Sequence, residues 1–372
     1  MQHKSNRNQK TTPIPQTADR VSTCHRASTS VSFWHRPATI TENNFVHKSL
    51  SNWAFNIAVG CAHGCQFCYV PDAATIKQGP ALSKYGVQDP DAEWGTYLLL
   101  RPWDEEKFLA SLRAAEKTPA SQLKPDGNRA VIYCSTTDPY QTVRHPVATV
   151  QKALAQHARF VVQRSLELIR DHSTINVRIL TRSPLAKQDF DLFRSFGNRL
   201  LFGMSLPTLR NDLSSIYEPK APAPSQRLAA LGEARKAGLH VFVAMAPTYP
   251  ECDESDLEAT LSEIAKLDPV TIFHEPINIR ARNVARIEAH AERLGTSVST
   301  SVFDSSASWQ QYAIKSLLAV RKIARKVGVA RRLHSWPDKS LGTAAVAQSV
   351  PNPNAHMKFI HQCWSRVSEW PR

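Results

Sequence analysis

Three cysteines lie within eight positions of the chain, Cys61, Cys65 and Cys68, in the stretch "VGCAHGCQFCYV". Their spacing is C-x3-C-x2-C, and clustered cysteines indicate metal binding or catalysis rather than a disulfide framework. A structural zinc site needs four ligands, and His63 would supply the fourth. An iron–sulfur cubane needs one thiolate for each iron, so three cysteines would leave its fourth iron open to a substrate or cofactor.

The cysteines follow the first of six short apolar segments that alternate with helical patterns. The predicted strands are residues 53–60, 130–136, 176–181, 200–206, 240–246 and 270–276. The predicted helices are residues 104–117, 147–170, 186–196, 225–237, 255–267 and 283–294. This alternation is typical of a parallel sheet that is covered on both faces. We therefore expect an α/β fold, either a partial barrel or a doubly wound sheet, with its chemistry at the carboxyl ends of the strands.

Polar side chains collect where the second predicted strand ends. Ser135, Thr136, Thr137 and Asp138 follow one another there. Hydroxyls and a carboxylate can accept hydrogen bonds from an ammonium group, so this segment is a candidate cofactor site. An Asp-Pro turn with capping hydroxyls is the structural alternative. Just before them stands Cys134, which could be a reactive thiol or a plain buried hydrophobic residue.

Other strand ends carry further candidates. Arg182 follows the third predicted strand and could pair with a carboxylate, and Ser205 ends the fourth. The stretch "FHEPINIRARN" after the sixth strand contains polar side chains that could bind substrate or cofactor, or simply cap a helix: Glu275, Asn278, Arg280, Arg282 and Asn283.

The charge of +14 is concentrated at the two ends of the 372-residue chain. Residues 1–36 carry a net charge of +5, residues 313–372 carry +9, and the residues between them are balanced. Basic ends predict an anionic partner such as nucleic acid, whereas a solvated tail and helix face would need none. A basic helix is predicted at residues 313–332.

The chain divides into three predicted parts. Residues 1–45 are predicted to be a largely disordered tail, because their first thirty are poor in apolar residues. Residues 46–295 form the predicted α/β core, and residues 296–372 form a C-terminal extension with the basic helix. No apolar run is long enough for a membrane span or a signal peptide. We therefore expect a cytoplasmic protein without a membrane partner.

The cysteine motif, with Tyr69 after Cys68, resembles that of the radical S-adenosylmethionine superfamily. The closer resemblance is to the branch of spore photoproduct lyase and its DNA repair photolyase-like relatives. It rests on "GCAHGCQFCYV", "CSTTDPYQ", "LELIRDHSTINVRILTRSPLAKQDFDLF", "MSLPTL" and "YEPKAPAPSQRLAALGEARKAGL". The resemblance covers about 250 residues, roughly 53–294, and implies a partial (β/α)6 barrel of the TIM type.

The resemblance also implies cofactors and roles. A 4Fe–4S cluster would be held by Cys61, Cys65 and Cys68, and His63 would not be a ligand. S-adenosylmethionine would bind the open iron and be cleaved reductively to a 5′-deoxyadenosyl radical, which abstracts hydrogen from the substrate. The implied cofactor-binding residues are Tyr69, Ser135, Thr136, Thr137, Asp138, Arg182 and Ser205.

The same resemblance assigns a catalytic role to Cys134, which would donate a hydrogen atom to the product radical. The spacing between this cysteine and Asp138 differs by one residue from that of the lyase. Implied partners are an electron donor such as a flavodoxin or ferredoxin and an unidentified substrate. A nucleic-acid base is one candidate substrate, and a peptide, protein or small metabolite is the alternative. The remaining hypothesis is a non-enzymatic zinc-binding protein, in which His63 and the three cysteines would be the ligands.

Overall fold

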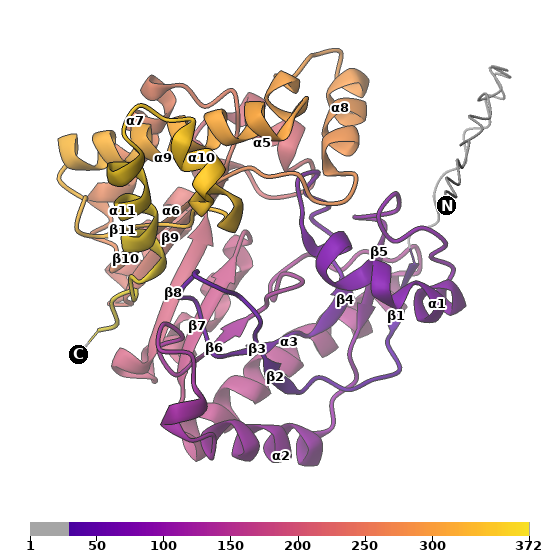
Figure 1. Ribbon diagram of the computed structural model, residues 1–372. Coiled ribbons are helices and arrows are strands. Elements are labelled where there is room, and N and C mark those ends of the chain that lie inside the picture. The colour runs from indigo at the N-terminus through magenta and orange to yellow at the C-terminus, as the bar shows by residue number, and fades with distance from the viewer. Residues whose placement is uncertain (1–29, 372) are drawn as a thin grey trace, which may run out of the picture.

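A mostly parallel sheet organises the computed structural model, which describes residues 30–371 (Figure 1). The strands of this sheet follow the order β11-β10-β9-β8-β7-β6-β3-β2. They are β2 (Ile40–Glu42), β3 (Trp53–Phe55), β6 (Ala130–Tyr133), β7 (Asn176–Thr181), β8 (Leu200–Ser205), β9 (Val241–Thr248), β10 (Thr271–Pro276) and β11 (Leu333–Ser335). Neighbouring strands run parallel except at the β2–β3 edge, which is antiparallel. The predicted α/β fold, a partial (β/α)6 barrel, is confirmed.

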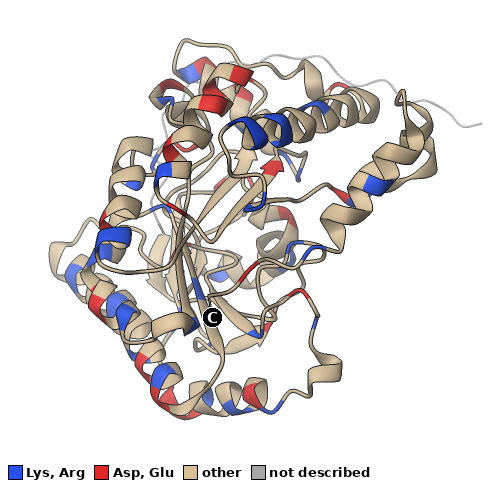
Figure 2. Cartoon of the chain, turned by 90° about the vertical axis from the view of Figure 1, so that its left-hand side faces the viewer, with Lys and Arg blue, Asp and Glu red and all other residues tan. Residues whose placement is uncertain are grey.

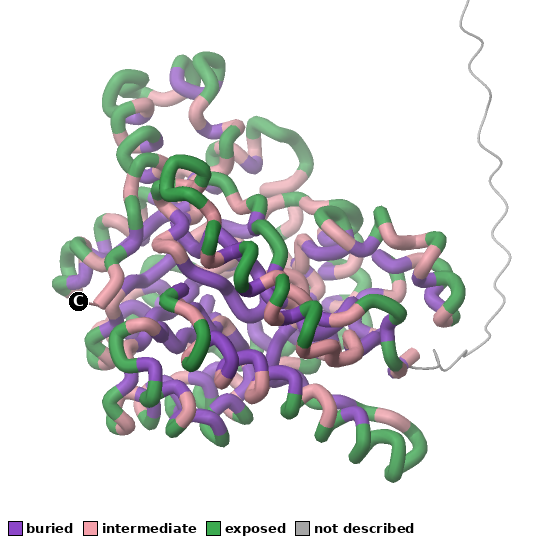
Figure 3. The backbone as a smooth tube through the Cα atoms, turned by 90° about the horizontal axis from the view of Figure 1, so that it is seen from below, coloured by how far each residue is buried: buried purple, intermediate pink, exposed green. Residues whose placement is uncertain are grey.

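Helices connect the parallel strands and cover the outer face of the sheet. The connecting helices are α2 (Glu105–Glu116), α3 (Ala148–His172), α4 (Phe190–Arg194), α6 (Pro224–Lys236), α7 (Glu254–Lys266) and α9 (Ser306–Lys326). Further helices are α1 (Gly79–Leu82), α5 (Asn211–Tyr217), α8 (Asn283–Arg293), α10 (Ala344–Gln348) and α11 (Pro353–Trp364). Figure 3 shows the consequence of this layering, with buried chain at the centre and exposed helical turns around it.

Helix α2 illustrates why these segments are helical. The side chain of Asp104 accepts a hydrogen bond from the backbone N–H of Lys107 and caps the first turn. Phe108, Leu112 and Ala115 then recur at helical spacing and are buried. The helix therefore places one apolar stripe against the sheet while its other side faces water.

The predicted strand 53–60 is wrong as a single element, because the chain turns at Asn56. Its amide Nδ2 donates to the Ser135 hydroxyl (3.1 Å), and its Oδ1 accepts from the Thr136 N–H (2.8 Å). These bonds fasten the turn to the end of β6 and divide the segment into β3 and β4 (Ala58–Gly60). Strand β4 belongs to a second sheet, β1-β5-β4, with β1 (Ser30–Phe33) and β5 (Tyr97–Leu100).

The two predicted terminal parts both contribute to the folded core. Of the predicted tail, residues 1–29 lie outside the described residues, while β1 and β2 fall within residues 30–45. In the C-terminal extension, the basic helix α9 begins and ends earlier than predicted, and β11 joins the sheet beside β10. Lys322 and Lys326 of α9 pair with Glu254 (3.1 Å) and Glu258 (2.6 Å) of α7. Figure 2 shows basic and acidic residues following one another along several helices.

The inward-facing side chains early in the strands fill the interior of the partial barrel. Leu201, Phe242 and Phe273 are buried there in one apolar cluster. The guanidinium of Arg178 is buried among them, within 5.0 Å of the Phe242 ring centroid, and donates to the Leu50 carbonyl at 2.9 Å. These side chains fill the interior early in the strands, and a cavity lies at the carboxyl ends instead.

Candidate functional site

A cavity of about 390 Å³ lies at the carboxyl ends of the strands and at the cysteine loop. All of the site residues predicted from the sequence line it. They are Cys61, Cys65, Cys68, Tyr69, Cys134, Ser135, Thr136, Thr137, Asp138, Arg182 and Ser205. These residues come from four separate segments of the chain. Folding therefore brings together every residue that the sequence analysis singled out for the cofactors and for catalysis.

Backbone contacts hold the cysteine loop in place. Gly60, just before Cys61, has φ +86°, and a Cβ atom there would lie 2.3 Å from the Tyr97 carbonyl oxygen. The Thr137 hydroxyl donates to the Gly60 carbonyl at 2.7 Å. The amide of Gln141 accepts from the N–H of Ala62 at 2.5 Å and donates to Thr137 at 2.7 Å. The segment after β6 thus fastens the start of the loop.

The three thiols are enclosed by protein. Cys61 and Cys65 are buried, and Cys68 is partly buried. Burial raises the pKa of Cys65 to about 12, and burial together with nearby acidic groups raises that of Cys61 well above its ordinary value. The thiols of the metal-free protein are therefore neutral at pH 7, and a positively charged metal group would favour their deprotonation.

The cysteine loop offers three thiols to one cavity. Within residues 30–371, no three His, Cys, Asp or Glu side chains converge closely enough to hold one metal ion. A 4Fe–4S cluster assigns each thiolate to its own iron, so its ligands surround a larger object. Three thiols that line one cavity would supply one ligand to each of three irons and leave the fourth iron open.

His63 is engaged elsewhere. Its Nε2 lies 3.2 Å from Oδ2 of the buried Asp138, and its Nδ1 lies 3.5 Å from the Lys220 carbonyl oxygen. With both ring nitrogens directed to other groups, His63 does not complete a four-ligand zinc site with the cysteines.

Asp138 is a buried anchor for several segments. Its Oδ1 accepts from the Thr181 hydroxyl (2.7 Å) and the Tyr140 N–H (2.8 Å), and its Oδ2 accepts from the Arg182 N–H (2.8 Å). Burial by itself would raise the pKa of Asp138, but His63 and these donors hold it below its ordinary value. The carboxylate is thus charged and already partnered, which fits positioning of the loop and strand ends.

A second contact joins the cysteine motif to the end of β6, through Tyr69. The Tyr69 hydroxyl donates to the Ser135 carbonyl at 2.5 Å. Burial raises the pKa of Tyr69, so its hydroxyl remains a donor at every physiological pH. Tyr69 therefore ties the end of the cysteine motif to the polar segment that follows β6.

Arg182 belongs to a buried ion network. Its Nε donates to Oε1 of Glu218 at 2.5 Å, and Nη2 of Arg227 donates to Oε2 of the same carboxylate at 2.6 Å. Arg227 also donates to the Ser205 carbonyl at 3.0 Å. Two guanidinium groups share one carboxylate, which leaves a surplus positive charge at the wall of the cavity beside Cys65. This charge favours an anionic group inside the cavity.

Cys134 stands at the end of β6 with its side chain in the cavity lining. Its exposed fraction is 6%. Burial, with a further contribution from Asp138, raises the pKa of Cys134 far above the usual range. The sulfur therefore keeps its hydrogen at neutral pH. A thiol in that state can give up a hydrogen atom, whereas a thiolate has none to give.

The cavity also contains side chains that the sequence analysis did not assign. Phe45, Lys48 and Trp336 line it, and the Lys48 ammonium lies 5.0 Å from the Trp336 ring centroid and 2.5 Å from Glu275. No local pattern marks them, because they come from a loop before β3 and from the end of β11. An amphipathic wall of aromatic rings and one ion pair suits a planar, polar substrate.

The stretch after β10 is divided between two roles. Glu275, Asn278 and Arg280 line the cavity. Arg282 instead pairs with Asp89 at 2.5 Å, and the Asn283 amide donates to the Asn278 carbonyl at 2.8 Å. Only the first half of the predicted polar stretch therefore lines the cavity, where Asn278 and Arg280 both donate to Asp338 at 2.9 Å.

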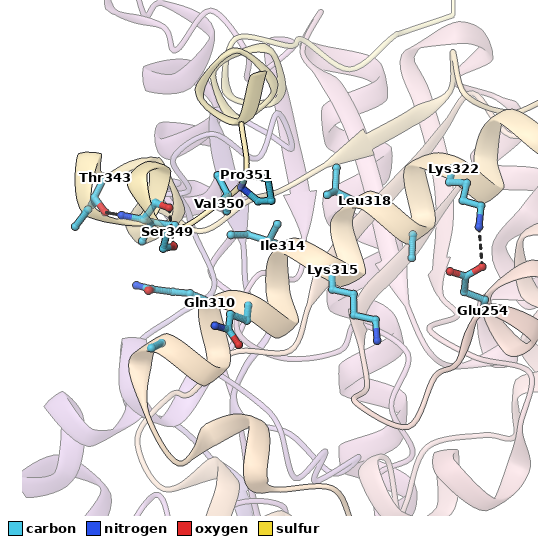
Figure 4. Close-up of a pocket in the computed structure, with 15 residues that line it drawn as sticks. Glu254, Gln310, Ile314, Lys315, Leu318, Lys322, Thr343, Ser349, Val350 and Pro351 are labelled. Atoms are coloured by element: carbon cyan, nitrogen blue, oxygen red, sulfur yellow. Dashed lines mark hydrogen bonds and ion pairs between the residues drawn. The ribbon is translucent and has the colours of Figure 1, made fainter. Parts of the chain in front are cut away.

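A second cavity, of about 670 Å³, lies between α9 and α10 (Figure 4). Apolar side chains such as Ile314, Leu318 and Val350 line much of it, and Lys322 and Glu254 pair at its edge. No cysteine or histidine lines this cavity. It lacks the reactive groups that the first cavity brings together.

The sequence of the chain is similar to those of two uncharacterized proteins. It is 33% identical over 261 residues to the uncharacterized protein ORF301 of Acidianus two-tailed virus, covering 68% of this chain and 76% of that protein. It is 22% identical over 234 residues to the uncharacterized protein MJ0683 of Methanocaldococcus jannaschii, and this match covers 62% of this chain and 72% of that protein. No family model matches the sequence.

Among solved structures, the chain resembles spore photoproduct lyase complexed with dinucleoside spore photoproduct. The TM-score is 0.58 at 14% identity, with 83% of this chain and 82% of that chain covered. A cysteine-to-serine variant of the lyase gives a TM-score of 0.59 at 12% identity, with 87% of each chain covered.

The chain thus has the fold of spore photoproduct lyase, which is the fold that the resemblance implied. The chain belongs to the same family as the viral protein ORF301. No helix within residues 30–371 is long and apolar enough to cross a membrane.

Proposed function

We propose that this protein is a radical S-adenosylmethionine enzyme. The observation that carries the proposal is the convergence of Cys61, Cys65 and Cys68 with Cys134 and Arg182 on one cavity at the strand ends. The three cysteines of the loop would hold a 4Fe–4S cluster. When bound together, the cluster and S-adenosylmethionine supply the one-electron chemistry that generates a 5′-deoxyadenosyl radical for hydrogen abstraction.

The chain's own residues prepare the cavity for these groups. Arg182, with its surplus positive charge, would receive the carboxylate of the methionine moiety. Thr137 and Asp138, already bonded to the loop and to the strand ends, would hold the cysteines in position. Tyr69 would fix the loop to β6. Enclosure of the cavity would keep water away from a reactive radical.

Production of 5′-deoxyadenosine tests this proposal. The anaerobic protein is reconstituted with iron and sulfide, reduced with dithionite and incubated with S-adenosylmethionine, and the product is measured by mass spectrometry. We expect 5′-deoxyadenosine from the wild type and none from Cys65→Ala. A matched control is Cys363→Ala, a buried cysteine outside the cavity, which should retain both iron and activity. Uptake of one zinc and no iron would refute the proposal.

We further propose that Cys134 donates a hydrogen atom to the product radical. Its buried position in the cavity and its retained S–H support this role. A Cys134→Ser variant should still make 5′-deoxyadenosine, because Cys134 is not one of the three cysteines proposed to hold the cluster. It should fail to complete turnover of the substrate. Loss of cluster binding in this variant would show instead that Cys134 is structural.

For the substrate we propose a nucleic-acid base, and the proposed enzyme would then act as a lyase in repair. The aromatic wall with Trp336 and Phe45 supports this, as does the dinucleoside bound by the structurally similar lyase. Fluorescence anisotropy with short oligonucleotides at increasing salt tests it, because phosphate contacts make affinity fall steeply with salt. Trp336→Ala should weaken binding, and salt-independent or absent binding would favour a peptide or small metabolite.

A further inference from the structure

Helix α8 holds the cysteine loop by three consecutive carbonyl groups. Arg286 donates through Nε to the carbonyl oxygen of Gln66 (3.2 Å) and through Nη2 to that of Cys68 (3.1 Å). Between these two bonds, the Asn283 amide donates to the Phe67 carbonyl oxygen at 3.3 Å. The three carbonyls belong to the segment that joins the second cysteine of the motif to the third. The helix therefore fixes the backbone that would carry two of the three cluster ligands.

Arg286 is a buried cation at this contact. Its side chain is only 10% exposed, and its Nη1 pairs with Oδ1 of Asp91. The Asp91 side chain is 2% exposed and also accepts from Nε of Arg282 at 2.9 Å. Each of the three guanidinium nitrogens of Arg286 thus has a partner of its own, two on the loop and one on Asp91. This arrangement uses the planar fork that distinguishes arginine from lysine.

The charge of Arg286 lies beside a residue that would hold one iron. The bond to the Cys68 carbonyl places the guanidinium against the third cysteine of the motif. A reduced cluster carries one more negative charge than an oxidised one, so a neighbouring cation stabilises the reduced state. Burial strengthens this effect, because little water is present to screen the charge. The Asp91 carboxylate acts in the opposite direction on the same cluster.

We infer that Arg286 is a positioning residue that sets the reduction potential of the proposed 4Fe–4S cluster. Its charge makes the cluster easier to reduce, and Asp91 offsets part of this effect. Reduction adds one electron to the cluster, and no bond to either side chain forms or breaks. The inference rests on the proposed function, because it requires that the cysteines hold a cluster.

A purely structural clamp is the alternative role for Arg286. Such a clamp would need the hydrogen bonds of the guanidinium but not its charge. Glutamine can still donate to a loop carbonyl and is neutral, whereas lysine keeps the charge and lacks the fork. The variants Arg286→Gln and Arg286→Lys therefore separate the effect of charge from that of hydrogen bonding.

A redox titration of the anaerobically reconstituted protein, followed by electron paramagnetic resonance, tests the inference. The titration is performed without S-adenosylmethionine, so its readout does not depend on turnover. The wild type is compared with Arg286→Gln and Arg286→Lys. The matched control is Arg282→Gln, which removes an equal charge from a side chain that is 57% exposed and bonds to Asp89 and Asp91 rather than to the loop. Iron content is measured for each variant.

We expect Arg286→Gln to be reduced less readily than the wild type. At a given potential, the ratio of reduced to oxidised cluster should fall on the order of tenfold, which corresponds to a midpoint about 59 mV more negative. Arg286→Lys and Arg282→Gln should titrate near the wild type. Equal midpoints in Arg286→Gln and the wild type would overturn the inference. An equal shift in Arg286→Lys or in Arg282→Gln would also overturn it, because the charge beside Cys68 would then not be the cause.

Asp91→Asn keeps the test decisive if Arg286→Gln takes up no iron. Asparagine retains an acceptor for Arg286 but removes the negative charge, so the midpoint should become less negative than that of the wild type. A midpoint equal to that of the wild type, or more negative, would overturn the inference. Failure of the proposed function would be seen separately, because the wild type itself would then show no reducible 4Fe–4S cluster.

Discussion

Replacement of Glu218 by glutamine should destabilise the protein more than any surface charge change. Glu218 is buried, and its two oxygens accept hydrogen bonds from Arg182 (2.5 Å) and Arg227 (2.6 Å). Glutamine is nearly the same size but carries no charge. The variant would leave two guanidinium groups close together without an anion, one of them completely buried. Removal of one partner from a buried ion pair typically costs about 3–5 kcal/mol.

The pKa of Glu218 leads to a similar magnitude. Burial would raise this pKa, but Arg227 and Arg182 lower it from 4.5 to about 2. The interval between these values corresponds to about 3 kcal/mol of stability. Because the pKa is lower in the folded protein, this contribution is complete above about pH 4.5 and is lost as the pH falls toward 2. The difference between wild type and Glu218→Gln should therefore shrink over the same interval.

Urea unfolding at pH 7, followed by tryptophan fluorescence, measures the effect. We expect Glu218→Gln to lower the free energy of unfolding by about 3–5 kcal/mol. The control is Glu233→Gln, which loses only an exposed ion pair with Lys187 at 3.0 Å and should change stability by less than about 1 kcal/mol. A change no larger than that of the control would refute the reasoning about the buried network.

Three further predictions follow from single contacts. Gly60→Ala should lose iron binding and cost at least about 1–3 kcal/mol in urea unfolding, because φ +86° and the Tyr97 carbonyl exclude a Cβ atom; unchanged iron content would contradict this. Asp138→Asn should cost about 1–3 kcal/mol and reduce iron uptake on reconstitution, because the buried donors around it lose a charged acceptor. Burial lowers the pKa of His274 from 6.5 to about 3. The unfolded chain therefore binds a proton at this histidine before the folded protein does, and the free energy of unfolding falls as the pH drops from 6.5 toward 3. Between pH 7 and 5 the wild type should lose about 2 kcal/mol more stability than His274→Gln, and parallel pH profiles would exclude this role.

Much of the core could be predicted from hydrophobic periodicity. The segment 176–181 was predicted as a strand and is β7, and the helix predicted at 255–267 is α7 at 254–266. Both segments have one apolar pattern that fits a single period, so local signals agree with the tertiary fold. Alternation of such segments was sufficient to indicate a parallel sheet.

The errors occurred where a side chain from a distant segment decided the local structure. Residues 53–60 are apolar throughout and look like one strand, but the bonds from Asn56 to Ser135 and Thr136 divide them. Strand β11 is only three residues long and gains its place by pairing with β10. Neither pairing is visible in the sequence around the element.

The residue types of the candidate site are determined by the sequence, and their arrangement is determined by the tertiary structure. The sequence alone specified the three-cysteine motif, and the resemblance linked it to Cys134 and to the polar residues after β6, because residue type and spacing within one loop are local properties. Only the tertiary structure decided that Glu218 and Arg227 support Arg182 and that Lys48 and Trp336 share the cavity. These residues are far apart in the chain, and they meet because parallel strands must bring their carboxyl ends to the same edge of the sheet.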